Sequence, residues 1–397
     1  MSTLCTALVA GLLAALVGGD EPDVAPADAW PMARGCSGGT GRSATALGLP
    51  LGEAWHRQFP DTAFGAVPVI AFGTVFIGDL DGTFRALSLA EGADRWSFAA
   101  QDTGFPSAAA AGVAGDARLV VVGDDGGLVR AFDALTGELR WTHATEGEIS
   151  GGPTILEAAD GPRVLVGSQD ASLACLALAD GRLIWRLTVA DQIRCSPTVA
   201  RTAAGNRVFL AGCDGTLHVI DADSGVERAA VPIDGPTGTT PAVSGERVFF
   251  GTEGGLFFGI DVAAGREAWR TAAATAGQSY RSSAAIAEGL AIVGFRGKAV
   301  EAFITADGTR AWRRPMRGRV DASPTVLSAH GPGAAAARPV VIVADTAGGV
   351  TVLEASDGAA LWEFDAGGGF DAGAAVADGR VVLASVDGTL WCFRGCD

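Results

Sequence analysis

The apolar residues of this 397-residue chain form short runs, and tight-turn residues separate successive runs. Residues 120–122 and 128–132 are two such runs, and Asp125-Gly126 lies between them. A two-residue hairpin turn requires positive φ angles, which Asp-Gly pairs adopt readily. The pattern predicts eight β-hairpins, at Asp81-Gly82, Asp125-Gly126, Asp170-Ala171, Asp214-Gly215, Glu253-Gly254, Arg296-Gly297, Gly348-Gly349 and Asp387-Gly388.

Tryptophan repeats in phase with the hairpins, at steps of 41, 45, 44, 84, 43 and 50 residues. The step of 84 spans two repeats, because Ala229-Ala230 stands where a tryptophan is expected. We expect each tryptophan to lie on the outermost strand of its repeat and to pack against the next one. These blade-docking residues are Trp55, Trp96, Trp141, Trp185, Trp269, Trp312 and Trp362.

A repeat of roughly 40 to 45 residues with four short strands is typical of a propeller blade. The sequence therefore predicts an all-β fold, an eight-bladed β-propeller of four-stranded antiparallel blades over residues 51–397. Trp55 precedes the first hairpin, and the last hairpin lacks a strand after it. We expect the N-terminal strand to complete the C-terminal blade and so to close the ring. The blade with Ala229-Ala230 should have a weaker or differently packed interface.

The N-terminal 50 residues differ in composition from the repeats. Residues 4–17 are an apolar stretch of 14 residues, which is short for a membrane span but typical of a signal peptide. We expect a signal peptide over residues 1–19, a linker and entry segment over 20–50, and a periplasmic or extracellular protein that does not span the membrane. The net charge of −16 argues against nucleic acid as a partner.

Cysteine use is compatible with export. Cys36 precedes the first blade and Cys396 lies at the C-terminus, where a closed ring brings the chain ends together. A disulfide between Cys36 and Cys396, or between Cys392 and Cys396, is therefore a hypothesis. Cysteine spacing indicates no metal site.

Polar residues gather before the small-residue strand that begins each repeat, and this strand should line the central channel. Two interpretations stay open: ion pairs exposed to solvent, or a surface for an acidic loop or extended peptide. The candidate channel-mouth residues are Glu148, Arg194, Tyr280, Arg281, Arg319, Asp321 and Asp371. The four histidines are scattered, and no catalytic residues are indicated.

Residues 131–141, AFDALTGELRW, resemble the A-x-D-x-x-T-G-x-x-x-W repeat of the pyrroloquinoline quinone (PQQ) propeller superfamily. Residues 30–35, WPMARG, resemble the W-P-M-F-R-G entry motif of its exported members. The resemblance implies either a quinone-dependent dehydrogenase or a non-enzymatic protein of the BamB-like branch, which serves outer-membrane-protein assembly. The enzymes hold the quinone on the axis between a tryptophan and a disulfide of adjacent cysteines, with calcium bound by Glu, Asn and Asp.

This chain has no adjacent cysteines and a single asparagine, Asn206. We therefore expect a monomeric binding or scaffold module with a protein or peptide partner of the cell envelope and no cofactor. A minimal alcohol or sugar dehydrogenase with PQQ and calcium is the alternative. A third hypothesis is an extracellular sensor for a cell-wall ligand.

Overall fold

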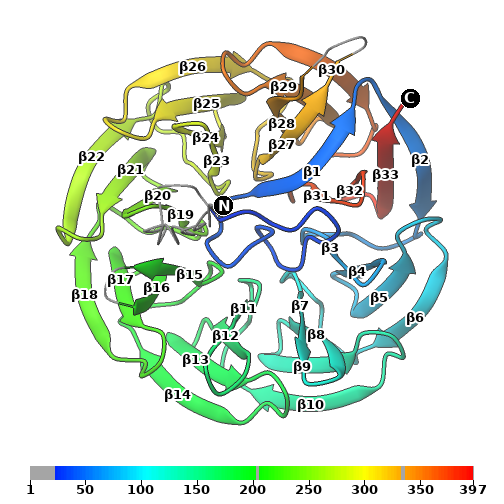
Figure 1. Cartoon of the computed structure of the whole chain (residues 1–397), viewed down its shortest axis with the longest axis vertical. Coiled ribbons are helices and arrows are strands. Elements are labelled where there is room, and N and C mark those ends of the chain that lie inside the picture. The colour runs from blue at the N-terminus through cyan, green and yellow to red at the C-terminus, as the bar shows by residue number, and fades with distance from the viewer. Residues whose placement is uncertain (1–22, 203–204, 332–335, 397) are drawn as a thin grey trace, which may run out of the picture.

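A computed structural model describes residues 23–202, 205–331 and 336–396. Their strands form eight sheets around a central axis, so the predicted eight-bladed propeller is confirmed (Figure 1). These residues contain no helix long and apolar enough to cross a membrane. The expected signal peptide lies outside them.

Each blade is an antiparallel meander whose strands run in order from the axis to the rim. Blade 1 comprises β3 (Val69–Ala71), β4 (Thr74–Gly78), β5 (Thr83–Ser88) and β6 (Asp94–Ala99); blade 2 comprises β7 (Ala110–Ala114), β8 (Ala117–Gly123), β9 (Leu128–Asp133) and β10 (Leu139–Ala144). Blade 3 comprises β11 (Thr154–Leu156), β12 (Arg163–Gly167), β13 (Ser172–Ala177) and β14 (Leu183–Thr188); blade 4 comprises β15 (Thr198–Thr202), β16 (Gly205–Ala211), β17 (Thr216–Asp221) and β18 (Glu227–Pro232).

The second half of the ring repeats this order. Blade 5 comprises β19 (Ala242–Ser244), β20 (Arg247–Gly251), β21 (Leu256–Asp261) and β22 (Arg266–Ala272); blade 6 comprises β23 (Ala285–Ala287), β24 (Leu290–Phe295), β25 (Ala299–Ile304) and β26 (Arg310–Pro315). Blade 7 comprises β27 (Thr325–His330), β28 (Arg338–Ala344), β29 (Gly349–Glu354) and β30 (Ala360–Asp365). Blade 8 comprises β31 (Ala375–Ala377), β32 (Arg380–Ala384), β33 (Thr389–Gly395) and β2 (Leu51–Gln58).

Ring closure follows the sequence prediction. Strand β2 pairs antiparallel with β33, in a register from Leu51 opposite Gly395 to Gln58 opposite Thr389. The N-terminal strand therefore supplies the outermost strand of the C-terminal blade. Because the two chain ends hold each other, the last blade has no missing strand at its rim.

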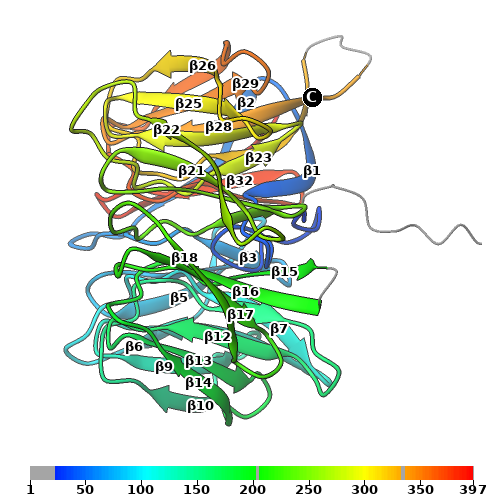
Figure 2. The ribbon, with the colours of Figure 1, turned by 90° about the vertical axis from the view of Figure 1, so that its left-hand side faces the viewer.

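Strand β1 (Arg42–Gly48) was not expected from the sequence. It pairs parallel with β27 and makes blade 7 five-stranded. The dark-blue segment before it crosses the centre of the ring (Figure 1), at the end of the axis where β1 lies in the side view (Figure 2). Residues 23–48 are therefore part of the propeller's packing and do not form a free linker.

The tryptophans join neighbouring blades as expected. Each of six indoles donates its Nε1 hydrogen to a main-chain carbonyl of the next blade, at 2.9–3.1 Å. The donor and acceptor pairs are Trp55 with Leu89, Trp96 with Ala134, Trp141 with Leu178, Trp185 with Ala222, Trp269 with Thr305, and Trp312 with Ala355. Trp362 instead packs against Phe364 and Phe393.

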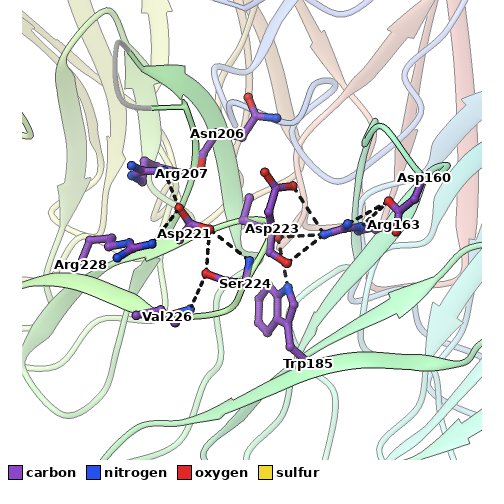
Figure 3. Close-up of polar contacts among 11 residues, drawn as sticks. Asp160, Arg163, Trp185, Asn206, Arg207, Asp221, Asp223, Ser224, Val226 and Arg228 are labelled. Carbon is purple, nitrogen blue, oxygen red and sulfur yellow. Dashed lines mark hydrogen bonds and ion pairs between the residues drawn. The ribbon is translucent and has the colours of Figure 1, made fainter.

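The glycine of the T-G turn makes room for the indole. A Cβ on Gly181 would lie 2.6 Å from the Trp141 ring, and five further turn glycines face an indole at 2.4–2.8 Å. The repeat aspartate orders the same turn. Asp221 accepts hydrogen bonds from the amide and hydroxyl of Ser224, which hold the pKa of its carboxyl below the ordinary value, and Trp185 docks alongside (Figure 3). The repeat motif therefore describes one joint shared by two blades.

The interface between blades 4 and 5 lacks this joint. Ala229 lies opposite Val219, in the register position that Trp185 occupies opposite Cys175. Among the described residues, no atom lies within 4 Å of where a Cβ on Gly265 would be. The Gly265 amide bonds the carbonyl of Val262, three residues earlier, whereas Gly181 and its equivalents bond the carbonyl four residues earlier. This interface is packed differently, as the sequence predicted.

The disulfide hypothesis is wrong for this structure, because Cys36, Cys392 and Cys396 are all free thiols. Cys36 is buried, and its sulfur lies 3.1 Å from the Thr40 hydroxyl. Cys392 is buried within β33, opposite Trp55, while Cys396 is exposed. The closed ring does bring the chain ends together, but Cys36 lies beside Thr40 in the segment before β1, whereas the Cys396 sulfur lies beside Gly52 at the start of β2.

Candidate binding surfaces at the two ends of the channel

The antiparallel meander gives the propeller two different ends. The Asp-Gly turns join the second and third strands of each blade, and they lie at the same end as the loops that cross to the next blade. We call this end the hairpin face. The opposite end carries the T-G turns and residues 23–41. We call residues 23–41 the plug, and this end of the propeller the plug face.

A cavity of about 310 Å³ opens at the hairpin face over blades 5 to 8. Its lining residues come from crossing loops and from one hairpin turn, and they are charged: Arg281, Arg296, Arg319, Asp321 and Asp371. Four of the seven residues predicted at the channel mouth are therefore brought together here. Three arginines face two aspartates, so the cavity carries a net positive charge.

One ion pair in this cavity is satisfied within the protein. The Arg296 guanidinium donates to both carboxylate oxygens of Asp321, at 2.8 and 2.9 Å. This two-bond geometry is the strongest that arginine makes, and it raises the pKa of Arg296 above its ordinary value. The pair fixes one wall of the cavity.

The other two arginines retain donors for a ligand. Arg281 lies 3.7 Å from a carboxylate oxygen of Glu253, with both side chains nearly half exposed, and such a pair contributes little energy. The backbone of Arg319 is held by Thr346: the Arg319 amide donates to the Thr346 hydroxyl, and the Thr346 amide donates to the Arg319 carbonyl. No described carboxylate lies within ion-pair distance of its guanidinium. These two guanidinium groups can therefore bind an anionic group.

The remaining predicted residues lie elsewhere. Arg194 bonds the side chain of Gln192 and does not line the cavity, and neither does Glu148. The expectation for Tyr280 was wrong, because its side chain is fully buried and its hydroxyl donates to buried Glu301. Burial is the main reason that the pKa of this hydroxyl lies far above its ordinary value, and the charge of Glu301 raises it further. Tyr280 packs between blades 5 and 6 and does not face the channel.

Sequence reasoning missed Arg296 as a lining residue of this cavity and Glu253 as the neighbour of Arg281. Both occupy hairpin-turn positions that carry aspartate in most blades. This departure from the repeat was visible in the sequence and could have marked both positions as candidate functional residues. That Arg296 would reach Asp321 of the next blade could be known only from the fold.

At the plug face, the plug closes the channel through main-chain bonds to the innermost strands. The Trp30 and Ile70 backbones exchange two hydrogen bonds, at 2.7 and 2.9 Å. Five further amides at the position equivalent to Ile70 donate to plug carbonyls at 2.7–2.9 Å. They are Ala111 to Pro31, Val199 to Ser37, Val243 to Gly38, Ile286 to Thr40, and Val326 to Gly41.

Arg34 anchors the plug to blades 6 and 7. Its Nη2 donates to the carbonyls of Ala284 and Pro324, at 3.0 and 2.9 Å. Burial lowers the pKa of Arg34 to about 10, so the guanidinium remains charged at neutral pH. A Cβ on Gly41 would overlap Nη2, which explains the glycine that follows the W-P-M-x-R-G motif. The entry motif is therefore a structural anchor.

A second and larger cavity, of about 1120 Å³, lies between the plug and the inner strands of blades 2 to 5. The carboxylates of Asp23, Glu157 and Glu246 line it, together with Arg201. Neither cavity includes a histidine among its described lining residues. Within the described parts of the chain, no group of three or more His, Cys, Asp or Glu side chains is placed to hold a metal ion.

Eight blades, joined at six interfaces by indoles docked on T-G turns and closed by the N-terminal strand, define a propeller of the PQQ-like class. A family model described as outer membrane protein assembly factor BamB matches residues 51–147, 125–204, 200–323 and 298–395. The chain therefore belongs to this family. No curated protein matches the chain.

Solved structures share the fold at low sequence identity. BamB from Moraxella catarrhalis is 18% identical, with a TM-score of 0.66 over 87% of this chain and 99% of its own. A europium-containing methanol dehydrogenase is 12% identical, with a TM-score of 0.73 over 93% and 98% of the two chains. Quinohemoprotein alcohol dehydrogenase from Comamonas testosteroni is 13% identical, with a TM-score of 0.71 over 93% and 81%. At these identities the similarity shows the fold alone.

Proposed function

We propose that this protein is a non-catalytic binding module of the cell envelope, which holds an acidic segment of a partner protein at the hairpin face. The main support is the pair Arg281 and Arg319, whose guanidinium groups share one cavity with no strong internal partner. Arginine donors in a shaped cavity bind carboxylates with directional hydrogen bonds. Membership of the BamB family makes assembly of outer-membrane proteins the setting that we propose.

The satisfied Arg296–Asp321 pair supports the same proposal, because it keeps the cavity open without using the other two arginines. Asp371 also lines the cavity and makes the site selective by repelling a ligand with too many charges. We also propose that the protein acts outside the cytoplasm, which the apolar residues 4–17 support.

Charge reversal tests the proposal. The double variant Arg281→Glu/Arg319→Glu and the unchanged protein are compared for capture of partners from an envelope extract and for binding of a short acidic peptide. A matched control is Arg182→Glu/Arg266→Glu, which changes the net charge equally at exposed positions of the T-G turns on the plug face. We expect the first variant to lose capture and the control to retain it. Equal capture by both variants contradicts the proposed site.

The dehydrogenase alternative has less support from the residues present. The axis at the plug face is occupied by the plug, the described cysteines are free, and Asn206 lies at the rim of the plug-face cavity. Trp30 is fully buried and does not offer a face to the channel. These residues do not fit the quinone and calcium site that the superfamily resemblance implies. Titration with PQQ and calcium tests this, and saturable binding with turnover of an alcohol or sugar would reverse the conclusion.

A further inference from the structure

Among the described residues, the plug accepts hydrogen bonds from the innermost strands of blades 1, 2 and 4 to 7 but not from the innermost strand of blade 3. Between Pro31 and Ser37 the plug makes a tight turn, closed by the Gly35 amide on the Met32 carbonyl, and a second turn follows, closed by the Gly39 amide on the Cys36 carbonyl. Pro31, whose carbonyl bonds blade 2, is therefore followed by Ser37, whose carbonyl bonds blade 4, and no carbonyl of the described plug residues between them bonds blade 3. At blade 3 the plug contributes side-chain packing without a hydrogen bond to a described residue of β11: a Cβ on Gly152 would lie 3.2 Å from Ala33, and Met32 belongs to the same core cluster as Ile155.

The consequence is a free strand edge at Ile155. Ile155 pairs with Val164 in the register position in which Ile70 pairs with Val75. At that position of an antiparallel pair, both the N–H and the C=O point away from the neighbouring strand and toward the axis. In blades 1, 2 and 4 to 7 a plug carbonyl accepts this N–H. Within the described residues, no hydrogen bond reaches the Ile155 amide.

The large plug-face cavity lies over this edge. Ile155, Leu156 and Glu157 line it, flanked by residues of blades 2, 4 and 5. Ile155 is buried and lines the cavity, so its unpaired N–H and C=O are sheltered from open solvent. An unpaired backbone donor in a largely buried position favours a ligand that carries its own acceptor.

The charges on the wall of the cavity select the ligand. Asp23, Glu157 and Glu246 outnumber Arg201, which leaves a net negative charge. Asp23 is already used, since it accepts hydrogen bonds from the Ser37 hydroxyl and the Gly38 amide. Glu157 and Glu246 are exposed and form no ion pair with a described residue.

We propose that this cavity binds an extended, basic peptide segment of a partner protein, which adds to the free edge of β11 through the N–H and C=O of Ile155. Strand addition supplies affinity through the main chain, and the two free carboxylates select lysine or arginine side chains. The site is separate from the hairpin-face cavity, and its ligand has the opposite charge.

Binding is measured with a fluorescent, end-blocked Lys-Thr-Lys-Thr-Lys-Thr peptide by anisotropy at low salt. The matched probes are the same peptide N-methylated at its two central residues, which removes main-chain donors and distorts pairing, and a Glu-Thr-Glu-Thr-Glu-Thr peptide. We expect saturable binding of the basic peptide and no binding of the acidic one. The N-methylated peptide should bind about threefold to tenfold more weakly than the basic one. Equal binding of all three peptides, or no saturable binding of the basic peptide, overturns the proposal.

Protein variants locate the site. Glu157→Lys/Glu246→Lys should weaken binding roughly tenfold and reduce its dependence on salt. Ile155→Pro removes the free N–H without removing a bond to β12, and it should weaken binding to a similar degree. If Ile155→Pro unfolds the protein, hydrogen exchange on the unchanged protein gives the same information, since the segment containing Ile155 should gain protection with the peptide. Arg281→Glu/Arg319→Glu should bind the basic peptide normally, and unchanged exchange at Ile155 refutes strand addition.

Discussion

The indole–glycine joint can be tested by placing the same substitution at two turn glycines of similar positive φ, one with an indole against it and one without. Gly181 and Gly265 occupy equivalent T-G turn positions, with φ angles of +72° and +62°. Gly181 lies against Trp141, whereas a Cβ on Gly265 would meet no described atom within 4 Å. Gly181→Ala and Gly265→Ala therefore share the backbone cost but not the steric cost.

The expected magnitudes follow from these contacts. Alanine at positive φ costs about 1–2 kcal/mol of unfolding free energy at either position. At Gly181 the new Cβ would lie 2.6 Å from the indole, so the ring must move. Displacing a well-packed side chain costs about 1–3 kcal/mol, and losing the 2.9 Å bond from Trp141 to the Leu178 carbonyl costs about 1 kcal/mol. We expect Gly181→Ala to cost roughly 2–4 kcal/mol more than Gly265→Ala.

The assay is equilibrium unfolding in urea, followed by circular dichroism, with the slope of the transition checked for constancy. A double-mutant cycle with Trp141→Ala isolates the contact between the two residues. In that background Gly181→Ala should cost only the backbone share, about 1–2 kcal/mol. Equal costs for the two glycine variants, or a Gly181→Ala cost that Trp141→Ala does not reduce, would refute the joint.

Three further predictions follow from the packing and from the titratable groups. Ala229→Trp should dock an indole on the open turn at Gly265 and raise the free energy of unfolding by about 0.5–2 kcal/mol. The control Ala230→Trp, on the exposed side of β18, should not. Equal urea midpoints for the two variants would contradict this. Alkylation of the native protein at pH 8 should modify exposed Cys396 but spare Cys36, whose pKa burial raises to about 11, and peptide mapping that finds Cys36 modified or disulfide-bonded would refute the assignment. Burial and Arg186 lower the pKa of His143, so the unfolded chain takes up this proton first and stability falls as pH drops through about 6.5. His143→Gln should therefore lose less stability than the unchanged protein between pH 7 and 5, and identical pH profiles would count against it.

Much of the fold could be predicted because its signals are local. Asp-Gly turns, short apolar runs and one tryptophan per repeat each report on a few neighbouring residues. Their common period fixes the number of blades, and the mismatch between hairpins and tryptophans shows that the ends must combine. The absence of an indole at Ala229 was likewise visible as a break in the period, and the open turn at Gly265 is its structural counterpart.

The candidate sites were predicted only in part. Repeat position places Arg281, Arg319, Asp321 and Asp371 at one mouth of the channel, because equivalent positions of different blades converge on the axis. The same argument misplaced Tyr280, which lies in the crossing loop between β22 and β23 but packs its side chain into the core between blades 5 and 6. Whether a residue of such a loop faces the channel or the space between blades depends on the path of the loop, which the repeat pattern does not specify.

By itself, the sequence determined the blade, its number of copies and the way the ring closes, because turn chemistry and alternation of apolar residues act over a few residues. Only the tertiary structure decided the path of residues 23–48, which carry no repeat and whose hydrogen bonds reach partners far along the chain, such as Arg34 with Pro324. The free edge at Ile155 and the charge of each cavity follow from that path, because they depend on which strands the plug pairs with and which it passes by.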